Sequence, residues 1–244
     1  MRATKYLIVN ADDFGQGPGV NRGIIEAHEH GIVTSTSLMT RWPAAEAAAL
    51  YAREHPTLSV GLHVDLGEWA YREGNWLPLY TVVPLDDAAA VKKEIAAQLA
   101  TFRRLLGRDP THIDSHQHVH LREPVRSALI EIARHLQIPI RHFTPGIRYC
   151  GSFYGQTAKG APLPEFISTD ALLDILAALP KELTELGCHP GEVNDLDTMY
   201  GSERAEELKV LCNPQIRTTI STLGVELCSF ANLPAEWPRP QAPA

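Results

Sequence analysis

The segment HIDSHQHVH, residues 112–120, places four histidines and one aspartate at alternating positions. Successive side chains of an extended strand point to opposite faces, so these five would share one face. Such a row predicts a metal site or a proton relay, and a histidine-rich surface strand is the alternative. The five side chains cannot all bind one ion, because His112 at least should lie too deep in the strand. The alternation should break soon after His116, which makes His116 the best-placed ligand.

The remaining polar residues of this segment then receive supporting roles. His118 and His120 would fall on the following loop, close enough for substrate contact or for support of a ligand. Asp114 could fix the tautomer of a neighbouring imidazole. The sequence GLHVD places His63 at the end of another strand, and Asp65 could orient it or simply begin the loop.

Two further motifs carry polar groups at strand ends. In NADDFG, Asp12 and Asp13 would repel each other unless a positive group lies between them. One carboxylate could bind a metal while the other, pointing elsewhere, acts as a base; helix-capping aspartates in a turn are the alternative. In CHPG, His189 is a candidate general acid because histidine is the side chain that ordinarily changes its charge near neutral pH. Cys188 should face away from the site.

One carboxylate and two imidazoles would leave coordination positions open for water and substrate. Hydrolytic metal centres are built in this way, whereas structural sites are usually closed by four protein ligands.

The elements that must position these groups alternate between short β-rich runs and helices. Apolar or β-branched runs predict strands over 6–11, 32–39, 58–66, 111–116, 138–144, 183–189 and 225–231. Helical patterns with Pro, Asp, Ser or Gly at their ends predict helices over 18–31, 43–55, 86–106, 123–137, 169–179, 202–211 and 214–223. Seven strands separated by helices predict parallel βα units.

A doubly wound open sheet and a barrel both satisfy this order. The polar clusters favour an α/β fold of the TIM-like (β/α)-barrel type with seven parallel strands, because each cluster follows a strand and barrel sites are assembled at those ends. We expect one catalytic domain over 1–233 with loop insertions near 67–84 and 146–168. A proline-rich tail over 234–244 should be disordered. Aromatic residues of the insertions could stack on a substrate or pack the loops: Trp69, Tyr71, Trp76, Phe153 and Tyr154.

Composition excludes several classes of function. The net charge of -7 argues against binding to nucleic-acid phosphates. No apolar stretch approaches the roughly 20 residues of a membrane-spanning helix. The four cysteines form no CxxC pair, which is typical of reduced thiols rather than of disulfides or a zinc ribbon. We therefore expect a cytoplasmic protein.

Several long segments, in this order, resemble the YdjC-like carbohydrate deacetylases, the family that includes chito-oligosaccharide deacetylase. They are LIVNADDFG, GIVTSTSLM, GLHVDL, THIDSHQHVH, and CHPG followed by YGSERAEEL. The resemblance implies a (β/α) barrel and a metal-dependent hydrolase that removes acetyl groups from an acetylated sugar or oligosaccharide. It also leaves a homodimer open.

The same resemblance implies roles for individual residues. Asp13, His63 and His116 would bind the metal, Asp12 would be the general base, and His189 would protonate the departing amine. Magnesium is the ion associated with the family, although two histidines and a carboxylate suit zinc or another transition metal equally well.

Three other functions are alternatives to the deacetylase. A metal-dependent phosphoester hydrolase would need more cationic groups than the loop residues Arg41, Arg148 and Lys159. A glycosidase needs two carboxylates across a cleft, which adjacent aspartates do not supply. A catalytically silent sugar-binding or scaffold protein would keep the barrel without turnover. The sequence names neither the sugar nor a preference for N- or O-acetyl groups.

Overall fold

Strand β1 (Lys5–Phe14) is the centre of a seven-stranded, all-parallel sheet in the computed structural model, which describes residues 4–192, 198–235 and 237. The strand order is β6-β3-β2-β1-β8-β7, and β9 also pairs with β1. The other strands of this sheet are β2 (Ser35–Leu38), β3 (Ser59–Val64), β6 (Ile113–Ser115), β7 (Ile147–Cys150), β8 (Leu183–Cys188) and β9 (Val225–Cys228). This confirms the predicted α/β fold with seven parallel strands.

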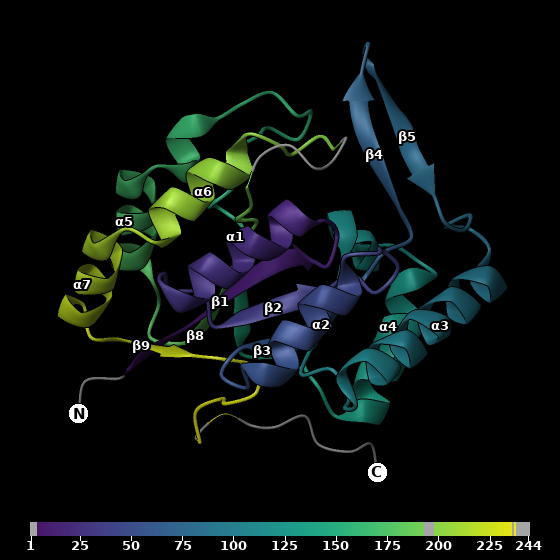
Figure 1. Ribbon diagram of the computed structural model, residues 1–244, viewed down its shortest axis with the longest axis horizontal. Helices are drawn as coiled ribbons and strands as arrows, with labels where there is room; N and C mark the ends of the chain where they lie inside the picture. The colour runs from purple at the N-terminus through teal and green to yellow at the C-terminus, as the bar shows by residue number, and fades with distance from the viewer. Residues whose placement is uncertain (1–3, 193–197, 236, 238–244) are drawn as a thin grey trace.

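The seven α-helices of the described chain lie around the outside of the sheet (Figure 1). They are α1 (Pro18–Glu29), α2 (Ala45–Glu54), α3 (Ala88–Leu106), α4 (Val125–Leu136), α5 (Thr169–Ala178), α6 (Glu203–Leu211) and α7 (Pro214–Thr222). The ends of each helix lie within one or two residues of the predicted ends, because capping residues such as Asp and Gly can be recognised in the sequence. The Asp87 carboxylate accepts from two backbone N–H groups at the start of α3, and Gly107 ends that helix at φ 68°. No described helix is long and apolar enough to cross a membrane.

The barrel is incomplete between its edge strands. Within the described residues, β6 and β7 do not pair, and only one parallel bridge, between Ile113 and Ile140, extends the sheet beyond β6. The predicted strand over 138–144 is therefore wrong. The side chain of Arg141 is buried, and the next residue, His142, has φ 67°, which an extended strand does not allow. The chain forms no strand from there until β7 begins at Ile147. Strand β7 lies inside the predicted 146–168 insertion, which also holds the short 3₁₀ helix Pro164–Ile167.

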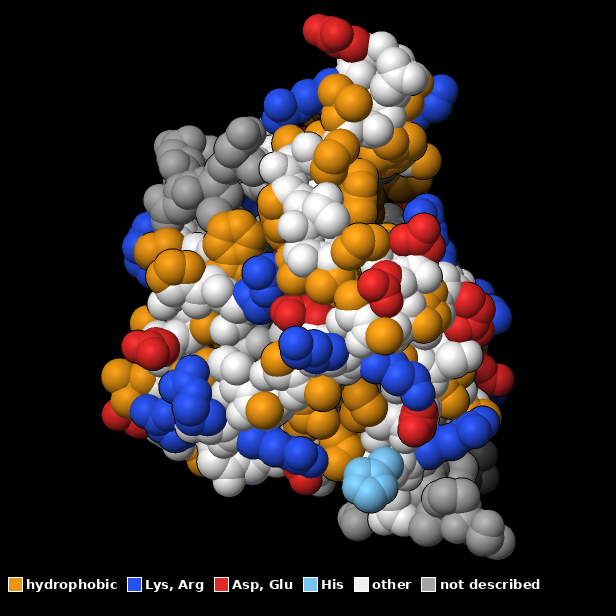
Figure 2. Space-filling view, turned by 90° about the vertical axis from the view of Figure 1, so that its right-hand side faces the viewer, with side chains coloured by type: hydrophobic (Ala, Val, Ile, Leu, Met, Phe, Trp, Pro, Cys, Tyr) orange, Lys and Arg blue, Asp and Glu red, His pale blue; other side chains and the backbone are white. Residues whose placement is uncertain are grey.

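The insertion after β3 is also more regular than the sequence indicated. Residues 67–84 contain an antiparallel hairpin of β4 (Gly67–Arg72) and β5 (Asn75–Thr81), which stands out from the body of the molecule (Figure 1). Its two turn residues, Glu73 and Gly74, both have positive φ, as in a type I′ turn. Hydrophobic side chains gather on this projection in Figure 2, and Trp76 and Leu77 are exposed. Most of the predicted tail lies outside the described residues.

Gly61 of β3 makes room for the buried ring of His112. The His112 ring stacks on Phe230 at 3.8 Å between centroids, and its Nε2 lies 3.2 Å from the Ser37 hydroxyl. A methyl group on Gly61 would come within 2.5 Å of that ring. His112 thus packs the interior of the sheet, as its depth in the strand suggested.

We expect Gly61→Ala to lower the free energy of unfolding by about 1–3 kcal/mol, because the stacked ring cannot move aside. Urea denaturation measures the loss, and Gly201→Ala is the matched control because nothing lies within 4 Å of its added methyl group. Adding His112→Ala to the first variant should recover part of the loss. Equal stability of Gly61→Ala and the parent would contradict the packing argument.

Candidate functional site

A cavity of about 800 Å³ lies at the carboxyl ends of the strands. Five residues that the sequence nominated line it together: Asp12, Asp13, His63, His116 and His189. They come from β1, from β3, from the segment after β6 and from the segment after β8. The convergence follows from parallel pairing, which brings the ends of neighbouring strands to one edge of the sheet.

Asp12 and Asp13 both face this cavity although they are neighbours on one strand. Asp13 has φ 71°, and the pairing of β1 with β2 shifts register between Ala11 and Phe14. A bulge of this kind breaks the alternation of side chains and redirects one of them. The expectation that the second carboxylate points elsewhere is therefore wrong.

Asp13 lies between the two candidate histidines. Its Oδ1 is 3.2 Å from His63 Nε2 and 3.0 Å from His116 Nδ1. Its Oδ2 accepts a hydrogen bond of 2.7 Å from Arg204 of helix α6. His63 Nδ1 meets Asp114 Oδ1 at 2.8 Å, so Asp114 fixes the orientation of that imidazole.

The electrostatics of this group favour positive charge. Burial opposes the charge on His63, but the carboxylates of Asp114 and Asp13 outweigh it and raise the pKa of its imidazole to about 10. Burial likewise opposes charge on His116, yet Asp13 and Glu68 raise its pKa to about 9. Burial raises the pKa of Asp13, but Arg204 and His116 bring it well below the ordinary value.

These residues fit a divalent metal ion. One ligand atom from each of Asp13, His63 and His116 lies within 4.8 Å of the other two, and all three residues are buried. Nε2 of both histidines is buried without a hydrogen-bond partner, although Asp13 and Glu68 approach these atoms at 3.2 and 3.5 Å. Such nitrogens are available to a cation, and carboxylate with imidazole is a donor set that zinc and related ions accept.

Asp12 belongs to a separate ion-pair network around Arg141. The guanidinium donates to both Asp12 oxygens at 2.6 and 2.7 Å, lies 2.8 Å from Asp114 and donates to Glu185 at 2.7 Å. Burial raises the pKa of Asp12, but Arg141 lowers it below the ordinary value, so the carboxylate is ionised. Asp12, His63 and Asp114 also come close enough to share an ion, but Arg141 already supplies the positive charge there.

His189 lines the cavity next to Asp12. Its Nε2 is 3.9 Å from Asp12 Oδ2, and its side chain retains 18% exposure. The backbone N–H of His189 donates to Glu207, whose carboxylate also accepts from the Tyr200 hydroxyl. The rings of Tyr154 and Tyr200 stack on each other, and their centroids lie 5.4 and 5.3 Å from that of the imidazole. The histidine is thus held in place while remaining open to the cavity.

The residues nominated for support or substrate contact separate into two groups. His118, Trp69 and Tyr154 line the cavity. Asp65 and His120 are buried outside its lining. The Asp65 carboxylate accepts from Gly67, Tyr80 and Trp42 at the base of the hairpin, so it begins the loop and Asp114 orients His63. Cys188 donates its thiol to the carbonyl of Asn10, away from the cavity.

The sequence motifs did not nominate four charged residues of the site: Glu68, Arg141, Arg204 and Glu207. Arg204 and Glu207 stand in the YGSERAEEL segment, which supported the family resemblance without a chemical assignment. Arg141 lies in the segment 138–144, which the sequence predicts as a strand. Its charge within a predicted buried strand is a signal of carboxylate partners, because buried arginine is rare unless it is paired.

The comparisons with known proteins agree with this picture. The family model described as YdjC-like protein matches residues 6–222. A carbohydrate deacetylase of Geobacillus stearothermophilus is 34% identical, with 93% of this chain and 97% of the relative covered. A chitooligosaccharide deacetylase of Serratia marcescens is 32% identical, with 94% and 99% covered.

Among solved structures, an Enterococcus faecalis protein provisionally described as a cellobiose-phosphate cleavage protein is 28% identical at a TM-score of 0.75, with 93% and 98% of the two chains covered. A family 4 carbohydrate esterase of Streptomyces lividans, in complex with acetate, has a TM-score of 0.55 at 14% identity, with 93% and 92% covered, which speaks for the fold alone. With a match over most of its length and relatives above 30% identity, this chain belongs to the YdjC-like protein family.

Proposed function

We propose that this protein is a metal-dependent carbohydrate deacetylase that hydrolyses the acetyl group of an acetylated sugar. The observation that carries the proposal is the position of Asp13 between His63 and His116, with the arginine-paired Asp12 beside it in the same cavity. The names of the two relatives at 34 and 32% identity, a carbohydrate deacetylase and a chitooligosaccharide deacetylase, support the same reaction.

Asp13, His63 and His116 would hold the metal, and each is oriented by a second charged residue. Arg204 fixes one oxygen of Asp13, Asp114 fixes His63, and Glu68 approaches His116. A bound divalent ion supplies Lewis acidity, which polarises a carbonyl and lowers the pKa of water. Magnesium follows from the resemblance to the family, while two imidazoles in the donor set suit zinc or another transition ion.

Asp12 and His189 would move the protons. Asp12 is ionised through Arg141, so it can accept a proton from the attacking water as the bond from water oxygen to acetyl carbon forms. His189 would give a proton to the sugar nitrogen as the C–N bond breaks, which releases acetate and a free amine. The separation of 3.9 Å between the two side chains lets both serve one acetamido group.

The cavity suits a sugar ring. Its volume of about 800 Å³ and its aromatic lining offer flat apolar surfaces for pyranose faces. Trp69 and Trp76 come from the projecting hairpin, while Tyr149 and Tyr154 come from the segment around β7; Phe153 is fully buried and packs that segment. An acetylated mono- or oligosaccharide is therefore the proposed substrate, and the name of the chitooligosaccharide deacetylase relative favours an N-acetyl group over an O-acetyl group.

Two alternatives find less support. A phosphoester hydrolase needs uncompensated cations, but Arg141 and Arg204 are paired with carboxylates inside the site. A catalytically silent sugar-binding protein would not require an ionised carboxylate such as Asp12 beside the candidate metal ligands, so the presence of Asp12 favours an enzyme. Four free thiols support the proposal that the protein works in the cytoplasm. A homodimer is proposed from the family resemblance alone.

Stripping the purified protein with a chelator should abolish acetate release, and one divalent metal should restore it. The measurement is a screen for acetate across acetylated mono- and oligosaccharides, with N- and O-acetyl compounds tested in parallel after addition of magnesium, zinc, cobalt or manganese. Chelator-treated protein that is refilled with calcium serves as the control for ionic strength. No acetate with any metal would overturn the proposed function and favour the sugar-binding alternative.

A further inference from the structure

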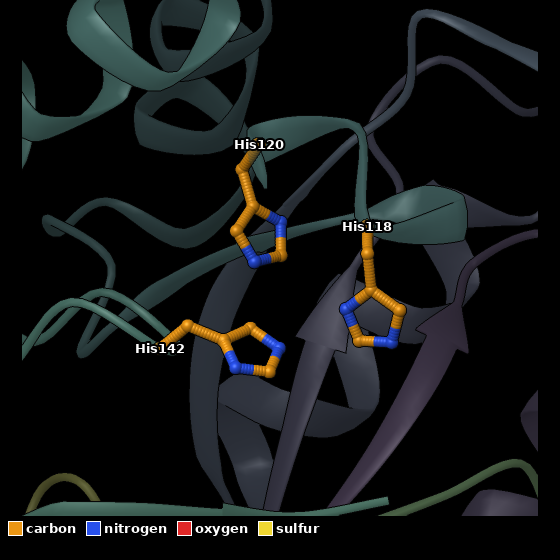
Figure 3. A group of neighbouring side chains, drawn as sticks. All are labelled: His118, His120 and His142. Atoms are coloured by element: carbon orange, nitrogen blue, oxygen red, sulfur yellow. The ribbon is translucent and has the colours of Figure 1, made fainter. Parts of the chain in front are cut away.

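Three histidines form a second cluster next to the cavity. None of them belongs to the group of Asp13, His63 and His116, which we call the Asp13 site. His118 and His120 come from the 3₁₀ helix His116–Leu121, and His142 follows the bridge at Ile140. Their ring centroids are separated by 5.5, 5.4 and 5.5 Å, so the rings form a nearly equilateral triangle. Figure 3 shows the three rings arranged around a common space.

Two buried ring nitrogens of this cluster have no hydrogen-bond partner among the residues that the structure describes. One nitrogen from each histidine lies within 4.8 Å of the other two. His120 is fully buried, and its Nε2 has no hydrogen-bond partner; the same holds for the buried Nδ1 of His118. A buried polar atom without a partner costs about 1–3 kcal/mol. Two such atoms facing one space indicate that something binds there.

The opposite side of His120 is fixed. Its Nδ1 lies 2.6 Å from the hydroxyl of Ser115, which also accepts the backbone N–H of His120. A metal-binding imidazole commonly uses its second nitrogen in a hydrogen bond that sets the ring orientation. His118 and His142 occupy left-handed backbone conformations, at φ 53° and 67°, which are unfavourable for residues with side chains. The backbone is therefore strained at His118 and His142, the two residues that place these rings.

The charge around the cluster is compatible with a cation. Arg141 precedes His142, but its guanidinium is bound by Asp12, Asp114 and Glu185. The cluster therefore has no uncompensated positive neighbour on the Arg141 side. His142 is exposed, so an ion can reach the cluster from the surface.

We propose that His118, His120 and His142 form a second metal site that binds zinc-like transition ions and excludes magnesium. Three imidazoles are a donor set that zinc, cobalt, nickel and copper prefer, whereas magnesium requires oxygen ligands. Zinc–nitrogen bonds of about 2.0–2.1 Å would draw the nitrogens together to about 3.3 Å in a tetrahedral site. The fourth position stays open, so the ion should exchange with solvent.

The test is the zinc stoichiometry of chelator-stripped full-length protein, measured by equilibrium dialysis and elemental analysis. The parent protein should bind two zinc ions per chain and His142→Asn one, since asparagine tolerates the left-handed backbone. His135→Asn removes an exposed histidine of helix α4 and should leave two. In a His63→Gln background, which weakens the Asp13 site, zinc should remain bound and be lost on adding His142→Asn.

Cobalt gives an independent readout. The second equivalent should produce the visible absorption bands of a low-coordinate Co²⁺ ion in the parent, and these bands should be absent in His142→Asn and His118→Asn. Affinity for the second ion should fall by roughly 100-fold or more in either variant. Circular dichroism shows whether each variant is folded. Equal stoichiometry in the parent and folded His142→Asn, or magnesium competing for the second ion, would overturn the proposal.

Discussion

Replacing Asp12 with asparagine should reduce kcat for acetate release by roughly 10²–10⁴-fold, the usual contribution of a general base. Asparagine keeps the size of the side chain and one oxygen for the hydrogen bond from Arg141, but it cannot take a proton from water. Because Asp13, His63 and His116 are unchanged, the metal content should stay the same. KM should change little, since the lost interaction belongs to the transition state.

The measurements are steady-state acetate release, metal content and thermal unfolding on the same protein preparation. Asp174→Asn provides the same chemical change at an exposed position of helix α5 and should leave all three unchanged. Activity of Asp12→Asn within a few-fold of the parent would show that another group is the base. Loss of metal together with activity would instead make Asp12 a ligand.

Arg141→Met should lower the free energy of unfolding by about 3–5 kcal/mol at neutral pH, the usual result of removing one partner from a buried ion-pair network. Arg141 is 3% exposed and pairs with Asp12, Asp114 and Glu185, so the variant leaves three buried carboxylates without their cation. Activity should fall with stability, because Asp12 loses its orientation.

The pH dependence of this variant has a definite sign. In the parent, burial raises the pKa of Asp114, but Arg141 and His63 bring it far below the ordinary value, so its contribution to stability is lost as the pH falls. Without Arg141, burial dominates and the folded protein binds protons more tightly than the unfolded chain. The stability difference between parent and variant should therefore shrink between pH 7.5 and pH 5.

Urea denaturation at these two pH values measures the difference. Arg126→Met is the matched control, because Arg126 pairs with Glu123 on the surface and its loss should matter little at either pH. A pH-independent deficit in Arg141→Met would indicate lost packing of the arginine stem as the cause, and would contradict the electrostatic argument.

The sequence by itself determined the element order and the nominated site residues. Apolar runs, helix caps and the alternation in HIDSHQHVH are local signals, and they correctly placed the helices and six of the seven strands of the main sheet. Parallel pairing brings the strand ends that carry Asp12, Asp13, His63, His116 and His189 to one edge of the sheet, where these residues line one cavity. The alternation was predicted to end soon after His116, and the strand does end there, because the 3₁₀ helix begins at His116.

Only the tertiary structure decided how these residues are used. The left-handed Asp13 turns two neighbouring carboxylates into the same cavity, although strand periodicity would separate them. Arg141 leaves the predicted strand because three buried carboxylates, distant in sequence, require its charge. The contact of His142 with His118 and His120 also depends on tertiary structure, because it forms only when two separate loops pack together. Local periodicity encodes which face a side chain takes, but the pairing of buried charge depends on long-range contacts that no local pattern contains.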